Sequence, residues 1–246
     1  MRRSILTSLF VSCLLLIAST ISAKVYVVSV GISNYKEIPS LVLPEKDAKA
    51  VHELYKKQTK DVILLTGKYA TKARIKKSLS DQFARATEND VIVFFFSGHG
   101  YQGGICPYDI SEKDLNSGLS YKEIKAILKQ SKAKNKIIIA DACFSGGLRG
   151  GAASDSGNDN DNSVILFLSS RSGETSGENP IMTNGFFTQA LVRGLKGGAD
   201  TNRDKRISAK EIFTFVSQRV KEQSKDKQHP VMWGNFDDGF VLMDWR

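Results

Sequence analysis

The sequence lacks several features that would assign it to other classes of protein. With only 3 Cys among 246 residues, it is not a small domain held together by a disulfide framework. No segment after the first 23 residues is long and apolar enough to form a transmembrane helix, and there are no internal repeats. The formal net charge is +9, but the lysines are scattered over predicted helices without an aromatic-interleaved basic motif. We therefore expect no nucleic-acid partner.

The first 23 residues have the layout of a secretory signal peptide. Two arginines at positions 2 and 3 precede a mostly apolar stretch over 5–17, and small residues follow, ending in Ala23. The alternative is a lipid anchor at Cys13, but the apolar stretch continues past this cysteine. We predict removal of residues 1–23 and export to the extracellular space or a periplasm, without a stable membrane anchor.

The remaining residues, 24–246, are enough for one α/β domain. Apolar runs of strand length alternate with amphipathic helical patterns, which is typical of a mainly parallel sheet covered by helices. The predicted strands cover 24–31, 61–66, 90–97, 136–142, 163–169 and 239–244, and the predicted helices cover 45–57, 72–87, 120–131, about 185–195 and 208–221. A Gly/Ser/Asn/Asp-rich stretch over 146–162 predicts a mobile loop, which is either a functional lid or processing site or a tolerated insertion.

Two reactive residues fall at the predicted carboxyl ends of neighbouring strands. His99 stands in Ser-Gly-His-Gly after the third strand, and Cys143 in Asp-Ala-Cys-Phe-Ser-Gly-Gly after the fourth. Ligands bind beyond the carboxyl ends of parallel strands, so both side chains are expected at one rim of the sheet. An imidazole beside a thiol activates it as a nucleophile toward a carbonyl. The backbone amides of Gly100 and Cys143 are predicted to stabilise the oxyanion.

These motifs resemble those of the caspase-like superfamily of cysteine peptidases, and specifically its metacaspase and bacterial caspase-like branch. The resemblance rests on VIVFFFSGHG, IIIADACFSGG and FLSSRSGETSGE, with GISNY near the start and GFFTQAL before the late helix. It covers essentially residue 24 to the C-terminus. It implies a three-layer α/β/α sandwich with a central sheet of about six strands, and a His99/Cys143 catalytic dyad. The cysteine motif departs from the Gln-Ala-Cys form of caspases, since Asp141 replaces the glutamine.

The resemblance also implies a substrate preference. In metacaspases the aspartate two residues before the nucleophile lines the primary specificity pocket, which here is Asp141, and a second acid on the first helix matches Asp47. Two carboxylates favour an Arg or Lys side chain. Each also has a structural alternative, namely a helix N-terminal acid for Asp47 and a strand-end hydrogen bond for Asp141. Cleavage after basic residues would make Arg149, in the 146–162 loop, and Arg171 candidate self-processing sites.

The remaining cysteine and histidines have no predicted catalytic role. Cys106 and Cys143 could form one disulfide bond in an oxidising compartment, which would block the nucleophile. His52 is expected to be solvated on the first helix. His229 precedes a proline, far from the catalytic motifs in sequence, and is expected to be uninvolved.

Residues 200–211 resemble an EF-hand loop, although the chemistry requires no cofactor. Calcium ligands would come from the side chains of Asp200, Asn202, Asp204, Ser208 and Glu211 and the carbonyl of Arg206. Lys205 stands where these loops have glycine, and basic neighbours disfavour a cation. The alternative is a capping box made by Ser208 and Glu211 for the next helix.

The leading hypothesis is thus a cysteine endopeptidase acting on proteins or peptides. Two alternatives stay open on the sequence. A catalytically silent member would use the fold as a binding or scaffold module. A transpeptidase or ligase would use the same dyad with an amine, not water, as the acyl acceptor.

Overall fold

The computed structural model describes residues 23–143, 163–170, 185–236 and 238–246. At Cys143 it describes the backbone only. Residues 1–22 of the predicted signal peptide, the whole 146–162 loop, and the candidate processing sites Arg149 and Arg171 lie outside these ranges. Within them, no helix is both long and apolar enough to span a bilayer.

The core of the fold is a central sheet whose main path has the strand order β2-β1-β3-β6-β7-β9. Five of these strands run parallel, and only β9 is antiparallel to its neighbour β7. The strands are β1 (Val25–Gly31), β2 (Val62–Thr66), β3 (Val91–Tyr101), β6 (Asn135–Cys143), β7 (Ile165–Leu168) and β9 (Val231–Trp233). Two short strands, β4 (Gly104–Ile105) and β5 (Leu119–Ser120), extend the sheet from β3.

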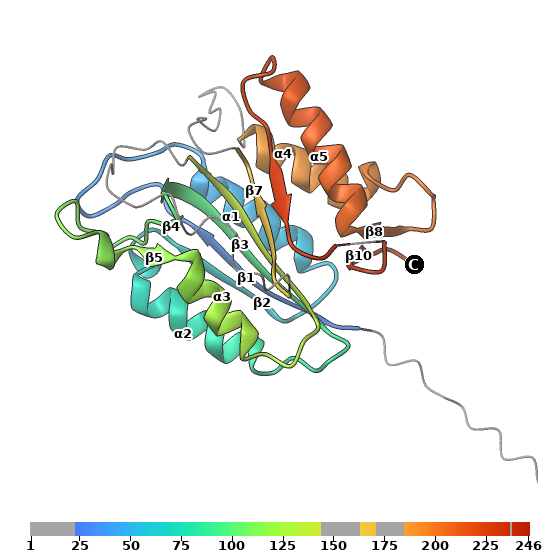
Figure 1. The fold of residues 1–246 in the computed structure, drawn as a ribbon, viewed down its shortest axis with the longest axis horizontal. Coiled ribbons are helices and arrows are strands. Elements are labelled where there is room, and N and C mark those ends of the chain that lie inside the picture. The colour runs from blue at the N-terminus through green and yellow to red at the C-terminus, as the bar shows by residue number, and fades with distance from the viewer. Residues whose placement is uncertain (1–22, 144–162, 171–184, 237) are drawn as a thin grey trace, which may run out of the picture.

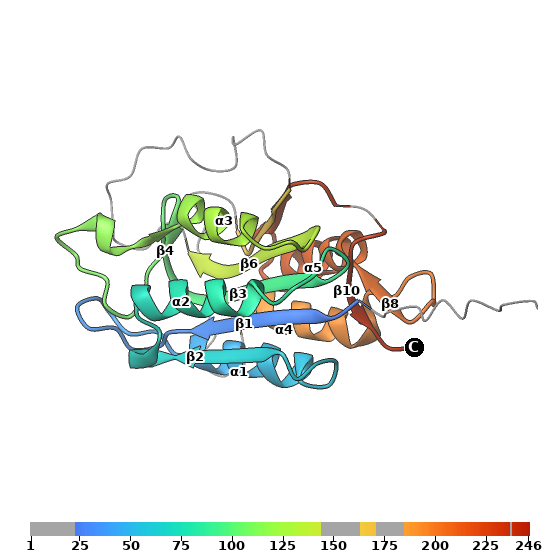
Figure 2. The ribbon, with the colours of Figure 1, turned by 90° about the horizontal axis from the view of Figure 1, so that it is seen from below.

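Helices cover both faces of the sheet (Figures 1 and 2). The helices α1 (Pro44–Tyr55), α4 (Phe186–Arg193) and α5 (Ala209–Gln223) share one buried cluster, and α2 (Lys72–Phe83) and α3 (Tyr121–Lys129) share another. Shorter helical segments are η1 (Gly67–Tyr69), η2 (Leu115–Ser117) and the π-helical η3 (Gly194–Gly198). The predicted three-layer α/β/α sandwich is therefore confirmed.

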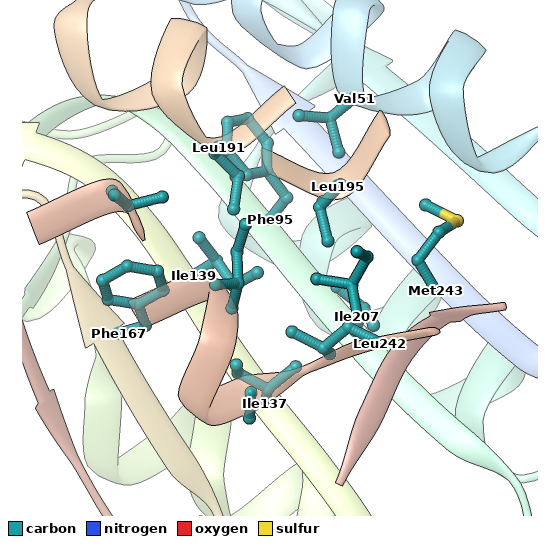
Figure 3. Close-up of a cluster of buried hydrophobic side chains, with 14 of the residues drawn as sticks. Val51, Phe95, Ile137, Ile139, Phe167, Leu191, Leu195, Ile207, Leu242 and Met243 are labelled. Carbon is teal, nitrogen blue, oxygen red and sulfur yellow. The ribbon is translucent and has the colours of Figure 1, made fainter. Parts of the chain in front are cut away.

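The pattern of β3 explains why both faces need helices. Val91, Val93 and Phe95 point into the α1/α4/α5 cluster, part of which Figure 3 shows, and the intervening Ile92, Phe94 and Phe96 point into the α2/α3 cluster. Successive side chains alternate between the two faces of a strand, so a continuous apolar run is buried on both.

The last predicted strand forms, but it does not join the main sheet. The segment predicted over 239–244 forms β10 (Val241–Asp244), which pairs with β8 (Arg206–Ser208) in a separate two-stranded ribbon. The sixth strand of the main sheet is instead β9, whose 3 residues are only partly buried or exposed. So short a segment carries no measurable hydrophobic alternation, which is why the sequence did not reveal it.

Two other boundaries differ from the prediction by more than two residues. The second helix was predicted over 72–87 but ends at Phe83, before a turn closed by Thr87 and Asp90. The third strand was predicted to end at position 97 but continues to Tyr101, because β6 pairs with it as far as His99 and β4 beyond. The extension places His99 inside the strand.

Candidate active site

The predicted catalytic pair lies on two adjacent strands. In the parallel β3–β6 register, Ser97 is opposite Asp141, Gly98 is opposite Ala142, and His99 is opposite Cys143. The backbone thus brings both residues to the carboxyl end of the sheet, where a ligand site is expected. The side chain of Cys143 lies outside the described part of the chain.

His99 is fixed by contacts from the segment that follows β1. Its backbone amide donates a 2.7 Å hydrogen bond to the hydroxyl of Tyr35, and the two rings lie 5.1 Å apart between centroids. Its Nε2 is 2.9 Å from the carbonyl oxygen of Pro39. A carbonyl can only accept a hydrogen bond, so this contact assigns the proton to Nε2 and leaves Nδ1 as the basic nitrogen.

The glycine before His99 is required by close packing. Gly98 has φ +157°, and a Cβ added to it would lie 2.5 Å from the Tyr35 hydroxyl and 2.8 Å from the ring of Phe96. A side chain at this position would displace Tyr35, and with it one of the contacts that hold His99. The Ser-Gly-His motif is therefore explained by local sterics as well as by chemistry.

The two predicted pocket acids are both buried and lie close to one residue. Asp47 is 2% exposed and Asp141 is 8% exposed. A Cβ built on Gly185 would lie 3.1 Å from Oδ2 of Asp141 and 3.7 Å from Oδ2 of Asp47. Three segments far apart in the sequence thus meet at one point, and a side chain at position 185 would crowd the Asp141 carboxylate.

Each carboxylate accepts hydrogen bonds from neighbouring elements. The hydroxyl of Ser97 donates to Asp47 at 2.8 Å, and the amide of Gly185 donates to the same side chain at 3.2 Å. Asp141 accepts from both the amide and the hydroxyl of Thr188, at 3.2 and 2.8 Å. Gly185 is the N-cap of α4, so the first turn of this helix directs its amides at the acids. The strand-end hydrogen bond considered for Asp141 is therefore present, and it is compatible with a pocket role.

Cys106 is a free, buried thiol. It packs with Tyr101 and Ile110 in a small apolar cluster. Burial raises the pKa of this thiol to about 12, so it is protonated at neutral pH. Because Cys106 is unbonded in the structure, it contradicts the alternative of a disulfide bond to Cys143 and serves as a small core residue.

The other two histidines have partners elsewhere on the surface. The prediction that His52 is solvated holds only in part, since its side chain is 16% exposed and its Nδ1 lies 3.0 Å from Glu53. His229 is 24% exposed, and its Nε2 lies 2.8 Å from Asp226.

The loop over 200–211 is organised by its own backbone amides. Oδ1 and Oδ2 of Asp200 accept from the amides of Asp204 and Lys205, and Asn202 also accepts from Asp204. Lys205 adopts φ 64°, the left-handed conformation for which EF-hand loops use glycine. Within the described ranges, no group of three or more His, Cys, Asp or Glu side chains is arranged to hold a metal ion.

The capping alternative for this loop is confirmed. Ser208 and Glu211 form a reciprocal capping box at the start of α5. The other carboxylate oxygen of Glu211 accepts from the amide and hydroxyl of Thr201. Partial burial raises the pKa of Glu211, but the hydrogen bonds from Ser208 and Thr201 outweigh it and hold this pKa below its usual range. Calcium binding by Asp200, Asn202, Asp204, Arg206, Ser208 and Glu211 stays a prediction.

Sequence reasoning missed several residues that hold the site together. Tyr35, Pro39, Ser97, Gly185 and Thr188 contact His99, Asp47 or Asp141. Tyr35 lies in the GISNY segment, and Gly185 and Thr188 lie in GFFTQAL. Both segments carry part of the resemblance, but nothing in their local pattern indicated which catalytic or pocket residue they contact.

A mainly parallel sheet, helices on both faces, and a His/Cys pair opposite one another on adjacent strands define a caspase-like fold with the site layout of a cysteine peptidase. The family comparison agrees with this class. A family model of the caspase domain matches residues 24–240, and the chain therefore belongs to the caspase domain family. That family consists of cysteine peptidases together with members that lack activity.

Solved structures support the fold. The crystal structure of protein GSU0716 from Geobacter sulfurreducens superposes with a TM-score of 0.68 at 18% sequence identity. The match covers 90% of this chain and 98% of that one. At this identity the likeness concerns the fold alone. A comparison with curated protein sequences finds no match.

Proposed function

We propose that this protein is an exported cysteine endopeptidase of the metacaspase type that cleaves peptide bonds after Arg or Lys. One observation carries the specificity, which is that the buried carboxylates of Asp47 and Asp141 lie beside Gly185, at the strand ends that hold His99 and Cys143. A guanidinium or ammonium group that entered between two carboxylates would be paired and desolvated, which favours basic substrates over all others.

In the proposed reaction, Nδ1 of His99 takes the proton of the Cys143 thiol, and Sγ attacks the scissile carbonyl, forming a C–S bond and a tetrahedral oxyanion. The oxyanion collapses, the C–N bond breaks, and His99 protonates the leaving amine. Water then attacks the thioester with His99 as general base, and the acid product and the thiol are released. The contact between Nε2 and Pro39 supports this role, because it fixes the ring with Nδ1 as the nitrogen that exchanges the proton.

The oxyanion role assigned to the amides of Gly100 and Cys143 is part of the proposal. Cys143 pairs with His99 at the end of the β3–β6 ladder, and Gly100 is the next residue of β3, where it pairs with Ile105 of β4. The pairing of β3 with β6 extends to His99 and Cys143. To stabilise an oxyanion, the backbone amides at this end must point toward the substrate and not toward the neighbouring strand.

Export and regulation complete the proposal. The positive, apolar and small-residue layout of the first 23 residues supports a signal peptide and release outside the cytoplasm. Arg149 and Arg171 are proposed self-processing sites because both follow the cleavage rule. The partner is a protein or peptide substrate, and the chemistry requires no cofactor. Calcium at 200–211 is proposed as an additional ligand on the spacing of its oxygen-bearing residues.

The decisive experiment is hydrolysis of a panel of fluorogenic peptides that differ only in the residue before the scissile bond. Mature protein (24–246), prepared under reducing conditions, is compared with Cys143→Ala, His99→Ala and the control Cys106→Ala, each with and without calcium. We expect cleavage after Arg and Lys that falls by at least about 100-fold in both active-site variants and persists in Cys106→Ala.

The other outcomes separate the alternatives. Cleavage after Asp would support the His99/Cys143 dyad but contradict the proposal that Asp47 and Asp141 form the specificity pocket. Product masses that show a new peptide bond would identify a transpeptidase. If the folded protein forms no product from any peptide, whether by hydrolysis or by acyl transfer, the result would contradict peptidase activity and favour a binding module. Activity unchanged by calcium, together with no calcium binding to Cys143→Ala, would reject the role of the 200–211 loop.

A further inference from the structure

At the end of the sheet opposite the candidate active site, the buried carboxylate of Asp90 accepts a hydrogen bond from the backbone nitrogen of Lys24. Asp90 precedes β3 and is 4% exposed. Its Oδ1 accepts a 2.8 Å hydrogen bond from the backbone N–H of Lys24. Its Oδ2 accepts from the amide and the hydroxyl of Thr87, each at 2.7 Å. Asp90 thus ties the residue before β1 to the turn before β3.

The same contact marks the start of the β1–β3 pairing. The amide of Val91 donates to the carbonyl of Lys24 at 2.8 Å, and Val25 is opposite Val91 in the register. The backbone nitrogen and carbonyl of Lys24 are therefore both fixed, one by a carboxylate and one by a strand. In the intact chain this nitrogen is an uncharged amide, bonded to the carbonyl carbon of Ala23.

The surroundings of Asp90 are suited to a positive charge. A buried carboxylate is costly to ionise unless hydrogen bonds or an opposite charge compensate it. Burial opposes ionisation of Asp90, but the hydrogen bonds from Thr87 and Lys24 and the charge of the Lys24 side chain lower its pKa. The carboxylate is thus ionised at neutral pH, and the donors at hydrogen-bond distance are amide and hydroxyl groups.

We propose that Asp90 is the receptor for a new α-ammonium group on Lys24, formed when the bond between Ala23 and Lys24 is hydrolysed. Hydrolysis breaks the C–N bond and adds the hydroxyl of water to the Ala23 carbonyl. The nitrogen gains the other proton of water and the proton of the new carboxyl group, which leaves a carboxylate and an ammonium group. The atom that now donates at 2.8 Å becomes the cation. The hydrogen bond from an uncharged amide to the carboxylate becomes a partly buried ion pair at the base of the sheet.

This inference rests on the proposed removal of residues 1–23 and is independent of peptidase activity. It makes the position of cleavage matter. Cleavage one residue earlier would leave an amide facing Asp90, and cleavage one residue later would remove the donor. Maturation after Ala23 would therefore stabilise the exported protein relative to its precursor, because the ion pair joins β1 to β3 only in the processed chain.

The test compares two preparations of Cys143→Ala, so that self-cleavage cannot interfere. One begins at Lys24, released from a fusion partner by a protease that leaves no extra residue, and the other carries one additional glycine before Lys24. Both are also made with Asp90→Asn. We expect the chain that begins at Lys24 to melt about 2–4 °C above the extended one, and the difference to vanish in Asp90→Asn. Equal melting temperatures, or a difference that survives Asp90→Asn, would overturn the proposal.

A second measurement does not depend on the Asp90→Asn variant, and therefore tests the proposal even if that variant fails to fold. The chain that begins at Lys24 is treated with an amine-acylating reagent under native and denaturing conditions, and the labelled α-amine is located by peptide mapping. We expect at least tenfold slower acylation of the α-amine in the folded protein, with the ε-amine of exposed Lys113 as internal reference. Equal rates would show that the group is not held by Asp90. N-terminal sequencing of the exported protein that finds a first residue other than Lys24 would also overturn the assignment.

Discussion

Asp47 accepts a 2.8 Å hydrogen bond from the hydroxyl of Ser97, the residue that lies opposite Asp141 in the β3–β6 register. Ser97 therefore contacts Asp47 through its side chain and is paired with Asp141 through the backbone of the two strands. This links the proposed specificity pocket to the strand that carries His99 only two residues later. A shift of β3 along β6 would change the pocket and the dyad together.

The first turn of α4 gives a prediction for specificity. Thr188→Val removes the hydroxyl that donates to Asp141 at 2.8 Å while leaving the backbone donor. We expect KM for Arg substrates to rise about fivefold, equivalent to the loss of ~1 kcal/mol from one hydrogen bond, with kcat nearly unchanged. Steady-state kinetics on paired Arg and Lys peptides measure this, and Thr188→Ser, which keeps the hydroxyl, should restore the wild-type KM. A fall in kcat at constant KM would assign Thr188 to another role.

The anchoring of His99 gives a prediction for catalysis. Tyr35→Phe keeps the ring packed near the imidazole but removes the hydroxyl that accepts from the His99 amide at 2.7 Å. We expect kcat to fall about tenfold, because a displaced base transfers protons less efficiently, and the preference for Arg or Lys to stay unchanged. The matched control is Tyr69→Phe, since Tyr69 is 53% exposed. Wild-type kcat in Tyr35→Phe would show that this hydrogen bond does not position the base.

The α2–α3 layer gives a prediction for stability. Partial burial of Glu123 opposes ionisation, but hydrogen bonds from Ser120 and the ammonium groups of Lys72 and Lys76 lower its pKa to about 2. The side chain is 34% exposed, so solvent screens much of this effect. We expect Glu123→Gln to lower the free energy of unfolding by about 1 kcal/mol at pH 7.

The pH dependence of that difference follows from the direction of the shift. A carboxylate whose pKa is lowered in the folded state stabilises fully above its unfolded pKa, about 4.3, and less as the pH falls toward its folded pKa. Denaturant unfolding at pH 7, 4 and 2.5 should therefore show the difference between wild type and Glu123→Gln shrinking with acidity. Glu112→Gln, at an exposed position, serves as control. A difference that is constant with pH would contradict the role of the charge.

Much of the framework was predictable because it depends on local patterns. The apolar run before His99 predicted a strand buried on both faces, and the run before Cys143 predicted its neighbour. The family resemblance predicted Asp47 and Asp141 as pocket acids, and the structure places both beside Gly185. The Ser208–Glu211 capping box was likewise foreseen, since a capping box joins residues three positions apart.

Tertiary structure alone decided which distant groups contact these residues. The carbonyl of Pro39 and the first turn of α4 reach the site from separate elements, and backbone groups carry no sequence signal. The choice of β9 over β10 as the last strand depended on which short segment could reach the open edge of β7. The sequence by itself determined the buried strands and the chemistry at their ends, because periodicity records which side chains avoid water. It could not determine long-range partners, because these follow from chain packing in three dimensions.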